Sequence, residues 1–361
     1  MKTILFRICF VFILIPSFVK AQESIKYLCD KPGKFFIQNN LNKCTGQDII
    51  SLTNNLTTIT AWLQQNNSAI NPPVGFDVAI NLFGNSCDKA IRNEEFGIYC
   101  SIGFTFRYFY IENGVSKTAS DWIARGSQFN INNPFLNIAT QFVEHGFDTD
   151  DPPQLKIPLE KALENLKRYY SINPIEKEIA PGVVLYAGGN ILVFNPNQPD
   201  ISIPVSVKEA MEAKMAYYKI KQEIDDVNYG KNLTAWAKMG FNPEISSQLK
   251  IYDAIKAEYD NFTADELNEW AYSSSSDGIS MINAQKKGAP VVRFNPACWD
   301  KLLPTSAIQF LSIEYQPAST SELESYIQRN NGVKDYIGLF YNNLPIEKMV
   351  DLIHKKNRQE K

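Results

Sequence analysis

The sequence predicts an α+β protein in which a helix packs on a mostly antiparallel sheet in the N-terminal half. Three observations predict this class: an apolar stripe with helical period, nearby segments that alternate with period two, and two similar Phe-Asn-Pro segments in the second half. A chain of 361 residues is long enough for two or three domains, since a domain takes roughly 100–200 residues.

The chain begins with the features of a secretory leader. Lys2 and Arg7 precede the apolar run "ICFVFILI", and the triplet "VKA" at 19–21 has the spacing of small residues that a signal peptidase cleaves. We expect residues 1–21 to be a signal peptide and the mature chain to start near Gln22, in the periplasm or outside the cell. No later segment reaches the roughly 20 apolar residues of a membrane span, so no span is expected.

Residues 22–151 are expected to form the first domain. Apolar side chains in residues 47–65 recur at three- and four-residue steps, which is typical of an amphipathic helix. Residues 76–82 and 101–111 alternate between apolar and polar side chains, as half-buried strands do. The turn "ENG" then closes a hairpin into "VSKT".

The acidic, double-proline stretch "HGFDTDDPPQ" puts the domain boundary at residue 151, because it neither continues a helix nor pairs in a central strand. Residues 152–361 are expected to form a second α+β domain. It opens with a predicted helix over residues 158–170. The apolar runs "VVLYA" and "ILVF", joined by "GGN", then predict a hairpin.

Two segments of this second region, residues 188–206 and 288–306, resemble each other. The stretches "VFNPNQPDISIPVS" and "RFNPACWDKLLPTS" share Phe, Asn, Pro, Asp, a second Pro and Ser without a gap. The Asn-Pro step starts a turn, and the Asp can accept main-chain hydrogen bonds within it. We therefore predict two diverged copies of a hairpin-turn-helix unit whose shared side chains serve the scaffold.

The final Ser of each copy is expected to begin a helix. Ser206 and Ser306 are followed three residues later by Glu209 and Gln309, which is the spacing of a capping box. A helix is predicted to follow the first copy at residues 207–226. The text after the second copy, "AIQFLSIEY", alternates and is rich in β-formers, so the elements that follow the two copies are expected to differ.

Removal of the leader leaves five cysteines: Cys29, Cys44, Cys87, Cys100 and Cys298. In an oxidising compartment the first four are expected to pair. Closeness in sequence favours Cys29 with Cys44 and Cys87 with Cys100, although four cysteines allow three connectivities.

Cys298 is the candidate catalytic nucleophile, with Asp300 beside it and His145 as the candidate acid–base group. A buried free thiol is the competing interpretation of Cys298, and a cation at a helix end is that of His145. The mature chain contains two histidines, His145 and His354, which excludes a His-Glu-x-x-His zinc site. No Gly-rich phosphate loop and no Gly-x-Ser-x-Gly motif is present.

Calcium is the one cofactor for which candidate ligands exist, although no cofactor is expected. The oxygen-bearing candidates are the linker residues Asp148, Asp150 and Asp151 and the turn residues Asn195, Asp200, Asn295 and Asp300. The linker group lacks the Gly and the closing Glu of the known calcium loop, and a solvated linker explains it equally. Turn formation explains the other four without an ion.

The net charge of −3, with both signs interspersed, gives no basic stripe and argues against a nucleic-acid partner. We expect a secreted or periplasmic, non-catalytic protein that serves binding, recognition or envelope assembly, with an extracellular or envelope ligand. Two alternatives remain open. One is a secreted hydrolase that uses carboxylates or Cys298 at the domain interface, and the other is a calcium-stiffened adhesion module.

Overall fold

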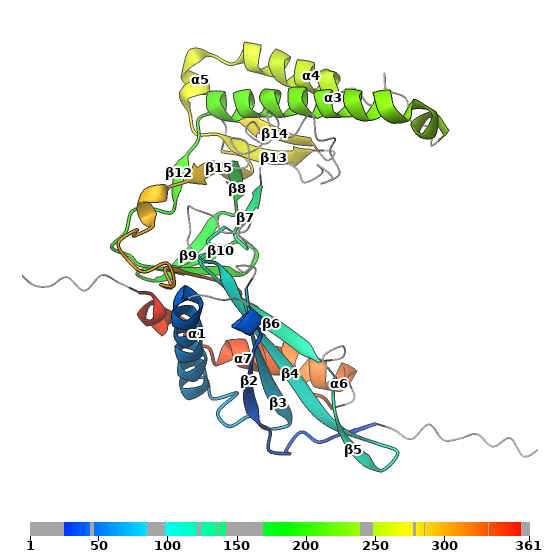
Figure 1. The fold of residues 1–361 in the computed structure, drawn as a ribbon, viewed down its shortest axis with the longest axis vertical. Coiled ribbons are helices and arrows are strands. Elements are labelled where there is room, and N and C mark those ends of the chain that lie inside the picture. Colours follow the sequence, from blue (N-terminus) through cyan, green and yellow to red (C-terminus); the bar gives the residue numbers. More distant parts are fainter. Residues whose placement is uncertain are drawn as a thin grey trace, which may run out of the picture.

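The computed structural model describes residues 25–43, 47–84, 98–120, 124–135, 137–141, 169–238, 248–276, 279–284, 286–330 and 332–354. They form an elongated molecule of helices and strands (Figure 1), which confirms the α+β class. The expected signal peptide lies outside the described residues. No helix in the described part of the chain combines the length and apolar character needed to cross a membrane.

A ten-stranded sheet occupies the lower and middle parts of the molecule in Figure 1. Its strands lie in the order β2 (Phe35–Asn39), β3 (Phe76–Phe83), β4 (Cys100–Glu112), β6 (Arg125–Ile131), β16 (Phe310–Glu314), β11 (Asn190–Phe194), β10 (Val183–Tyr186) and β9 (Ile175–Ala180), with β1 (Lys26–Tyr27) and β5 (Val115–Thr118) beside β4. Strands β2 and β3 pair in parallel because helix α1 (Gln47–Asn66) connects them as a crossover. The other described pairs of this sheet are antiparallel.

The helix, strands and hairpin predicted for the first region are confirmed where the structure describes them. Helix α1 buries its apolar stripe, including Leu52, Leu56 and Leu63, and strand β3 pairs over its whole predicted length with residues 102–108 of β4. Asn113 and Gly114 form the tight turn between β4 and β5, and both have the positive φ that such a turn requires, 52° and 73°. The short helix η1 (Asn40–Lys43) links β2 to the segment before α1.

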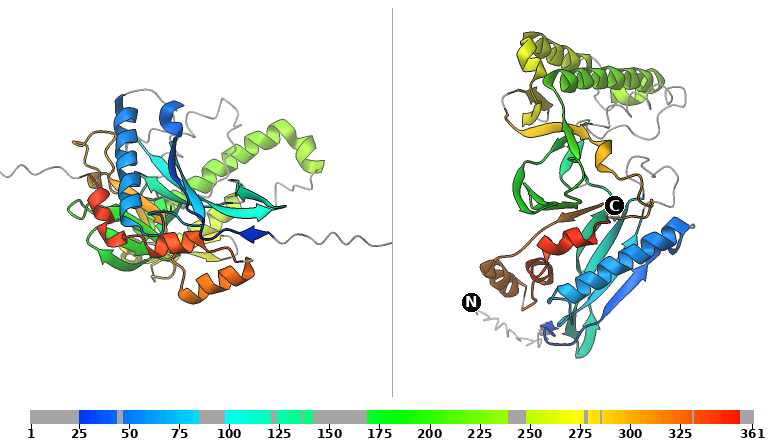
Figure 2. Two further views of the ribbon diagram at one scale, coloured as in Figure 1. Left: turned by 90° about the horizontal axis from the view of Figure 1, so that it is seen from below. Right: turned by 90° about the vertical axis from the view of Figure 1, so that its left-hand side faces the viewer.

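The C-terminal segment returns to the first region and completes its core, which was not predicted. Strand β16 pairs with β6, and the helices α6 (Thr320–Arg329), α7 (Tyr336–Asn342) and η4 (Ile346–Leu352) follow it. Figure 2 shows this segment beside α1. The ring of Phe340 is fully buried, 5.2 Å from Phe104 and 5.4 Å from Phe106 between centroids. The expected boundary at residue 151 lies outside the described residues and stays a prediction.

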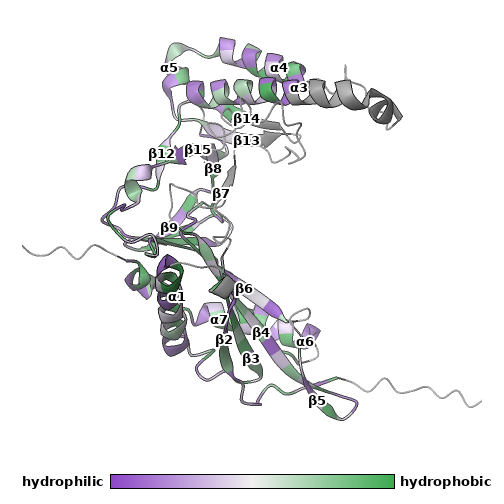
Figure 3. Ribbon diagram, in the orientation of Figure 1, coloured by the Kyte–Doolittle hydropathy of each residue, from purple (hydrophilic) through white to green (hydrophobic). Residues whose placement is uncertain are grey.

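A second sheet of six strands carries a helical arm. Its strands are β14 (Ile279–Asn283), β13 (Tyr272–Ser276), β15 (Ala289–Phe294), β8 (Tyr169–Ile172) and β7 (Ala139–Gln141), with β12 (Ser202–Pro204) beside β15. The arm consists of α3 (Val207–Lys238), α4 (Gln248–Asn261) and α5 (Ala264–Asn268). In Figure 3, α4 and the coloured first part of α3 show hydrophilic and hydrophobic residues in alternation, since the two helices pack on each other and contribute to a separate apolar cluster.

One predicted helix is wrong at its end. Residues 158–168 lie outside the described part of the chain, but Tyr169 and Tyr170 belong to strand β8, which pairs with β15. Tyr170 also stacks on Phe135, with 4.4 Å between the ring centroids. Pairing with distant strands overrides the local helical pattern here.

The two Phe-Asn-Pro segments lie against each other. The Asn295 side-chain amide donates a hydrogen bond to the carbonyl of Asp200 (2.7 Å), and the Asn295 main-chain N–H donates to Ile201 (2.9 Å). After the first segment, Ser206 accepts a hydrogen bond from the N–H of Glu209 (3.1 Å) and α3 begins at the predicted residue. A strand and a turn are therefore present in each of the two segments, side by side, and their origin as copies of one unit stays a prediction.

The predicted capping box at Ser306 is wrong, because strand β16 follows the second segment instead of a helix. The amide of Gln309 instead bridges back to Asp300, accepting from its N–H (2.8 Å) and donating to its carbonyl (3.0 Å). The alternating, β-forming residues of "AIQFLSIEY" predicted this segment correctly, because they indicated a strand.

Candidate functional site

One face of strand β4 carries buried phenylalanines, and further along the strand the same face carries half-buried tyrosines. Phe104 and Phe106 face the core beneath α7, and Tyr108 comes next on the same face. Tyr27 of β1 lies opposite Tyr110 of β4 and adds a ring to the same surface. The period of the strand therefore places aromatic residues with polar hydroxyl groups where the core ends.

These tyrosines line a cleft of about 290 Å³ between the sheet, α6 and the segment that leads into α7. We call it the tyrosine cleft. Its lining residues are Tyr27, Phe106, Tyr108, Arg125, Tyr326, Arg329, Asn330, Val333, Lys334, Tyr336 and Ile337. Helix α6 forms the outer wall and has no fully buried residue, so it is held to the molecule along its flank rather than within the core.

The tyrosine rings form a corner. The rings of Tyr27 and Tyr108 meet edge to face, with 5.5 Å between centroids and 67° between planes. The pKa of Tyr108 is raised, first by burial and then by the neighbouring tyrosines Tyr27, Tyr110 and Tyr326. Burial likewise raises the pKa of Tyr336. Both hydroxyl groups are thus neutral at ordinary pH; that of Tyr108 can donate a hydrogen bond to a ligand, whereas that of Tyr336 already donates to the carbonyl of Gly75 (3.3 Å).

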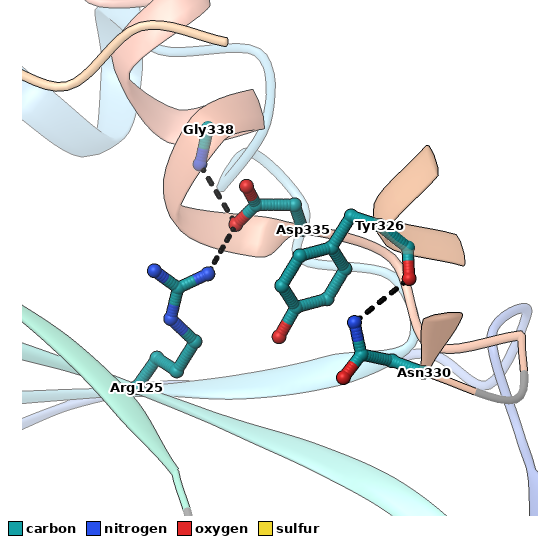
Figure 4. A network of polar contacts seen from close by, with 5 residues as sticks. All are labelled: Arg125, Tyr326, Asn330, Asp335 and Gly338. Carbon is teal, nitrogen blue, oxygen red and sulfur yellow. Dashed lines mark hydrogen bonds and ion pairs between the residues drawn. The ribbon is translucent and has the colours of Figure 1, made fainter. Parts of the chain in front are cut away.

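Three cationic side chains, Arg125, Arg329 and Lys334, line the cleft, and no acidic side chain of the described residues does. Figure 4 shows Arg125 reaching Asp335, which lies outside the lining, at 3.0 Å, while the same carboxylate accepts from the N–H of Gly338 as the N-cap of α7. The Arg125 guanidinium also lies 5.3 Å from the centre of the Tyr326 ring. Lys334 is half-buried, and its ammonium makes no hydrogen bond or ion pair to the described residues.

A second, more open hollow of about 520 Å³ adjoins the cleft. The two share Arg125, Tyr326, Arg329 and Asn330. The hollow is otherwise lined by Gln316, Pro317, Ala318, Glu322 and Asp335. The cleft and the hollow together form one groove along the inner face of α6.

The sequence-predicted nucleophile lies elsewhere. Cys298 is 2% exposed, and burial raises the pKa of its thiol to about 12. His354 lines the same hollow, but its Nδ1 accepts the N–H of Ile308 at 3.0 Å. That hollow holds about 10 Å³, close to the space of a single water molecule, so it cannot admit a substrate. Asp300 is bonded to the N–H of Leu302 (2.9 Å), and His145 lies outside the described residues.

The side-chain oxygens of three of the four candidate calcium ligands in the turns, Asn195, Asn295 and Asp300, accept main-chain N–H groups. The amide oxygens of Asn195 and Asn295 accept the N–H groups of Asn197 and Ala297, both at 3.1 Å. Asp200 contributes its main-chain carbonyl to Asn295. No group of three or more potential metal ligands gathers within the described ranges. Asp148, Asp150 and Asp151 fall outside those ranges, so a linker site stays a prediction.

Two of the four cysteines expected to pair are described, and both are free thiols. Cys29 donates to the carbonyl of Gly332 at 3.2 Å, and Cys100 is buried at the start of β4. Cys29 follows Leu28, which bonds to Phe109 near the opposite end of β4, so Cys29 cannot pair with Cys100. Cys44 and Cys87 lie outside the described residues, and the two remaining connectivities stay predictions.

Comparison with protein-family models, curated proteins and solved structures finds no significant match. The function therefore has to be inferred from the chemistry of the groove. None of its residues stood out in the sequence. The aromatic run "FRYFYI" in β4 was the only local signal, and it predicted a strand face without showing where the covering helix would begin.

Proposed function

We propose that this chain is an exported, non-catalytic binding protein and that the tyrosine cleft is its ligand site. The observation that carries the proposal is the composition of the cleft: its described lining contains four tyrosines and three cations and no acidic residue, in a chain whose net charge is −3. Such a lining is complementary to a ligand that combines an anionic group with a flat apolar surface.

The cleft has the features of a small-molecule site. It is concave, its base is formed by Phe106, Val333 and Ile337, and its polar groups converge from several elements. Arg329 uses its Nε for the carbonyl of Ser325 at 3.3 Å, which orients the guanidinium at the end of α6. Lys334 is half-buried, and a partly desolvated cation attracts an anion more strongly than a fully hydrated one does.

The proposal of a non-catalytic role is supported by the state of the candidate nucleophile. Cys298 is protonated and enclosed, and its hollow has no room for a substrate. The hydrolase and calcium-module alternatives have no comparable support among the described residues.

Thermal unfolding of the protein tests the ligand site. The probes are glucuronate, benzoate and N-acetylglutamate, each compared with its neutral counterpart glucose, benzamide or N-acetylglutamine. A ligand at roughly 100 times its Kd stabilises the folded state by about 2.7 kcal/mol, which raises Tm by a few degrees. We expect a rise with at least one anionic probe and none with its counterpart.

The double variant Arg329→Gln/Lys334→Gln is expected to abolish that rise. Lys256→Gln, which changes an exposed cation on α4, is the matched control and is expected to keep it. If no anionic probe raises Tm, or if the double variant responds like the unmodified protein, the proposed site is wrong.

The proposed export has a separate test. Mass spectrometry of the protein from fractionated cells should find an N-terminus near Gln22, in the periplasm or the medium. Recovery of chains that retain residues 1–21 from the cytosol would contradict export.

A further inference from the structure

The groove changes character along its length. Among the described residues, the tyrosine cleft has cations and no acid, whereas the adjoining hollow adds the carboxylates of Glu322 and Asp335 and the amide of Gln316. Arg125, Tyr326, Arg329 and Asn330 lie at the junction and belong to both parts, so Lys334 is the cation that belongs to the cleft alone. A ligand that fills the groove therefore contacts cationic residues and tyrosines in the cleft, and a mixture of charged and amide residues in the hollow.

The cationic end suits one carboxylate. Lys334 provides an ammonium without a partner among the described residues, and the neutral hydroxyl groups of the tyrosines can add hydrogen bonds. The perpendicular rings of Tyr27 and Tyr108 give two flat surfaces in a corner. A pyranose ring has apolar faces that can rest on such rings, with its polar groups around the edge.

The mixed end suits neutral hydroxyl groups. The carboxylates of Glu322 and Asp335 accept hydrogen bonds from hydroxyls, and they balance the charges of Arg125 and Arg329, which line this part of the groove as well. The amides of Gln316 and Asn330 can both donate and accept. A uniformly acidic polymer would gain no net charge attraction in this part of the groove.

We propose that the groove binds a carboxylated sugar at the end of an otherwise neutral oligosaccharide, with the carboxylate near Lys334 and the neutral sugars beside Glu322 and Asp335. This inference rests on the proposed function and names the ligand class of the same site. An acidic peptide, which has no ring faces of this kind, is the competing ligand and is included in the test.

Calorimetric titration of the full mature chain distinguishes these ligands. The carbohydrate probes are 3′-sialyllactose against lactose, and a glucuronosyl disaccharide against its neutral glucosyl analogue. Trigalacturonate and an acetylated Ala-Ala-Glu peptide are the acidic competitors. We expect at least one acidic glycan to bind about tenfold or more tightly than its neutral partner, a difference large enough to assign to one ionic contact. Trigalacturonate and the peptide are expected to bind more weakly than that glycan.

Two kinds of variant separate charge recognition from ring stacking. Lys334→Gln should remove most of the difference between the acidic and the neutral glycan. Tyr108→Ala should weaken both glycans, and Tyr108→Phe, which keeps the ring, should restore most of the affinity. Lys256→Gln on α4 is the charge-matched control and should bind like the unmodified protein.

The failures are distinguishable. Binding of the peptide or of trigalacturonate in preference to the acidic glycans would overturn the ligand class and leave the proposed anion site standing. Equal binding of acidic and neutral glycans would overturn the role of the carboxylate. If no anionic probe binds at all, the proposed function itself fails.

Discussion

The thiol of Cys298 packs in one buried cluster with Trp299 and Phe310, and this environment determines its reactivity. At about pH 8, four units below the pKa of about 12, a fraction on the order of one in ten thousand is thiolate. We predict that iodoacetamide modifies Cys298 and Cys100 only after unfolding, whereas the partly exposed Cys29 reacts in the folded, reduced protein. Mass spectrometry of the labelled peptides measures the three rates. Rapid labelling of native Cys298 would revive the nucleophile hypothesis.

Asn132 is a second buried residue, and its hydrogen-bond partners show its structural role. It is fully buried with φ of 56°, and its amide joins three separate segments. The oxygen accepts the N–H groups of Gln309 (2.8 Å) and Phe310 (3.3 Å), and the nitrogen donates to the carbonyls of Ile98 (3.1 Å) and Ala307 (2.9 Å). The side chain thus holds the start of β16 to the end of β6.

We predict that Asn132→Ala lowers the free energy of unfolding by about 2–4 kcal/mol, because it leaves buried groups without partners and because alanine tolerates positive φ less well than asparagine does. Asn132→Gly removes the backbone strain but not the lost hydrogen bonds, so it should remain clearly destabilised. Chemical denaturation measures both. Asn197→Ala, at an exposed turn, is the control and should change stability by less than about 0.5 kcal/mol. A loss confined to the alanine variant would show that strain, not hydrogen bonding, matters.

At the scale of elements, helix α6 forms a wall of the groove, and the hydrogen bonds of its N-terminal cap stabilise it. Glu322 and Ser319 form a capping box, and hydrogen bonds from the Ser319 side chain and main chain lower the pKa of Glu322. A lowered folded-state pKa means that this stabilisation is complete above the unfolded value near 4.5 and disappears as the pH falls through the folded value.

We therefore predict that α6 opens more readily below about pH 4.5 than at pH 6, the unfolded value of Glu322 marking the start of the loss. Hydrogen exchange of the α6 amides, corrected for intrinsic rates, measures the opening. Glu322→Gln should show increased opening at pH 6 and little further change on acidification. Glu324→Gln on the same helix is the control, since it alters the charge equally without touching the cap. Unchanged α6 exchange in Glu322→Gln would contradict the prediction.

The elements that could be predicted are those whose pattern is local. The leucine stripe of α1, the alternation in β3 and β4, and the turn at Asn113 each depend on neighbours in sequence. The groove could not be predicted in this way. Tyr108, Arg125 and Tyr326 come from three distant segments, and only the pairing of β6 with β16 brings α6 over β4.

At the scale of the whole molecule, the first core needs both ends of the chain. Leu56 of α1, Phe104 of β4 and Phe340 of α7 belong to one buried cluster, whereas the arm has a cluster of its own. Proline and acidic residues near position 151 indicated a boundary, but no local signal shows that a chain will return after more than a hundred residues. The arm is thus an insertion between segments that build the groove's framework.

This arrangement predicts that the arm can be removed together with strands β13 and β14 and the first half of β15. In β12 and β15, Pro204 lies opposite Val292, so replacing residues 205–291 by Asn-Gly joins the two strands through a two-residue hairpin turn. The buried cluster of the arm lies wholly within the deleted residues, and the first core has no member there. We expect the shortened chain to fold and to bind the best anionic probe with a Kd within about twofold of the full chain, as titration would measure.

Phe340→Ala in the full chain tests the shared core instead. With the arm intact, this substitution should lower the free energy of unfolding by about 3–5 kcal/mol, because it removes a fully buried ring from that core. If the shortened chain fails to fold while Phe340→Ala is tolerated, the two ends do not form the independent core that holds the groove.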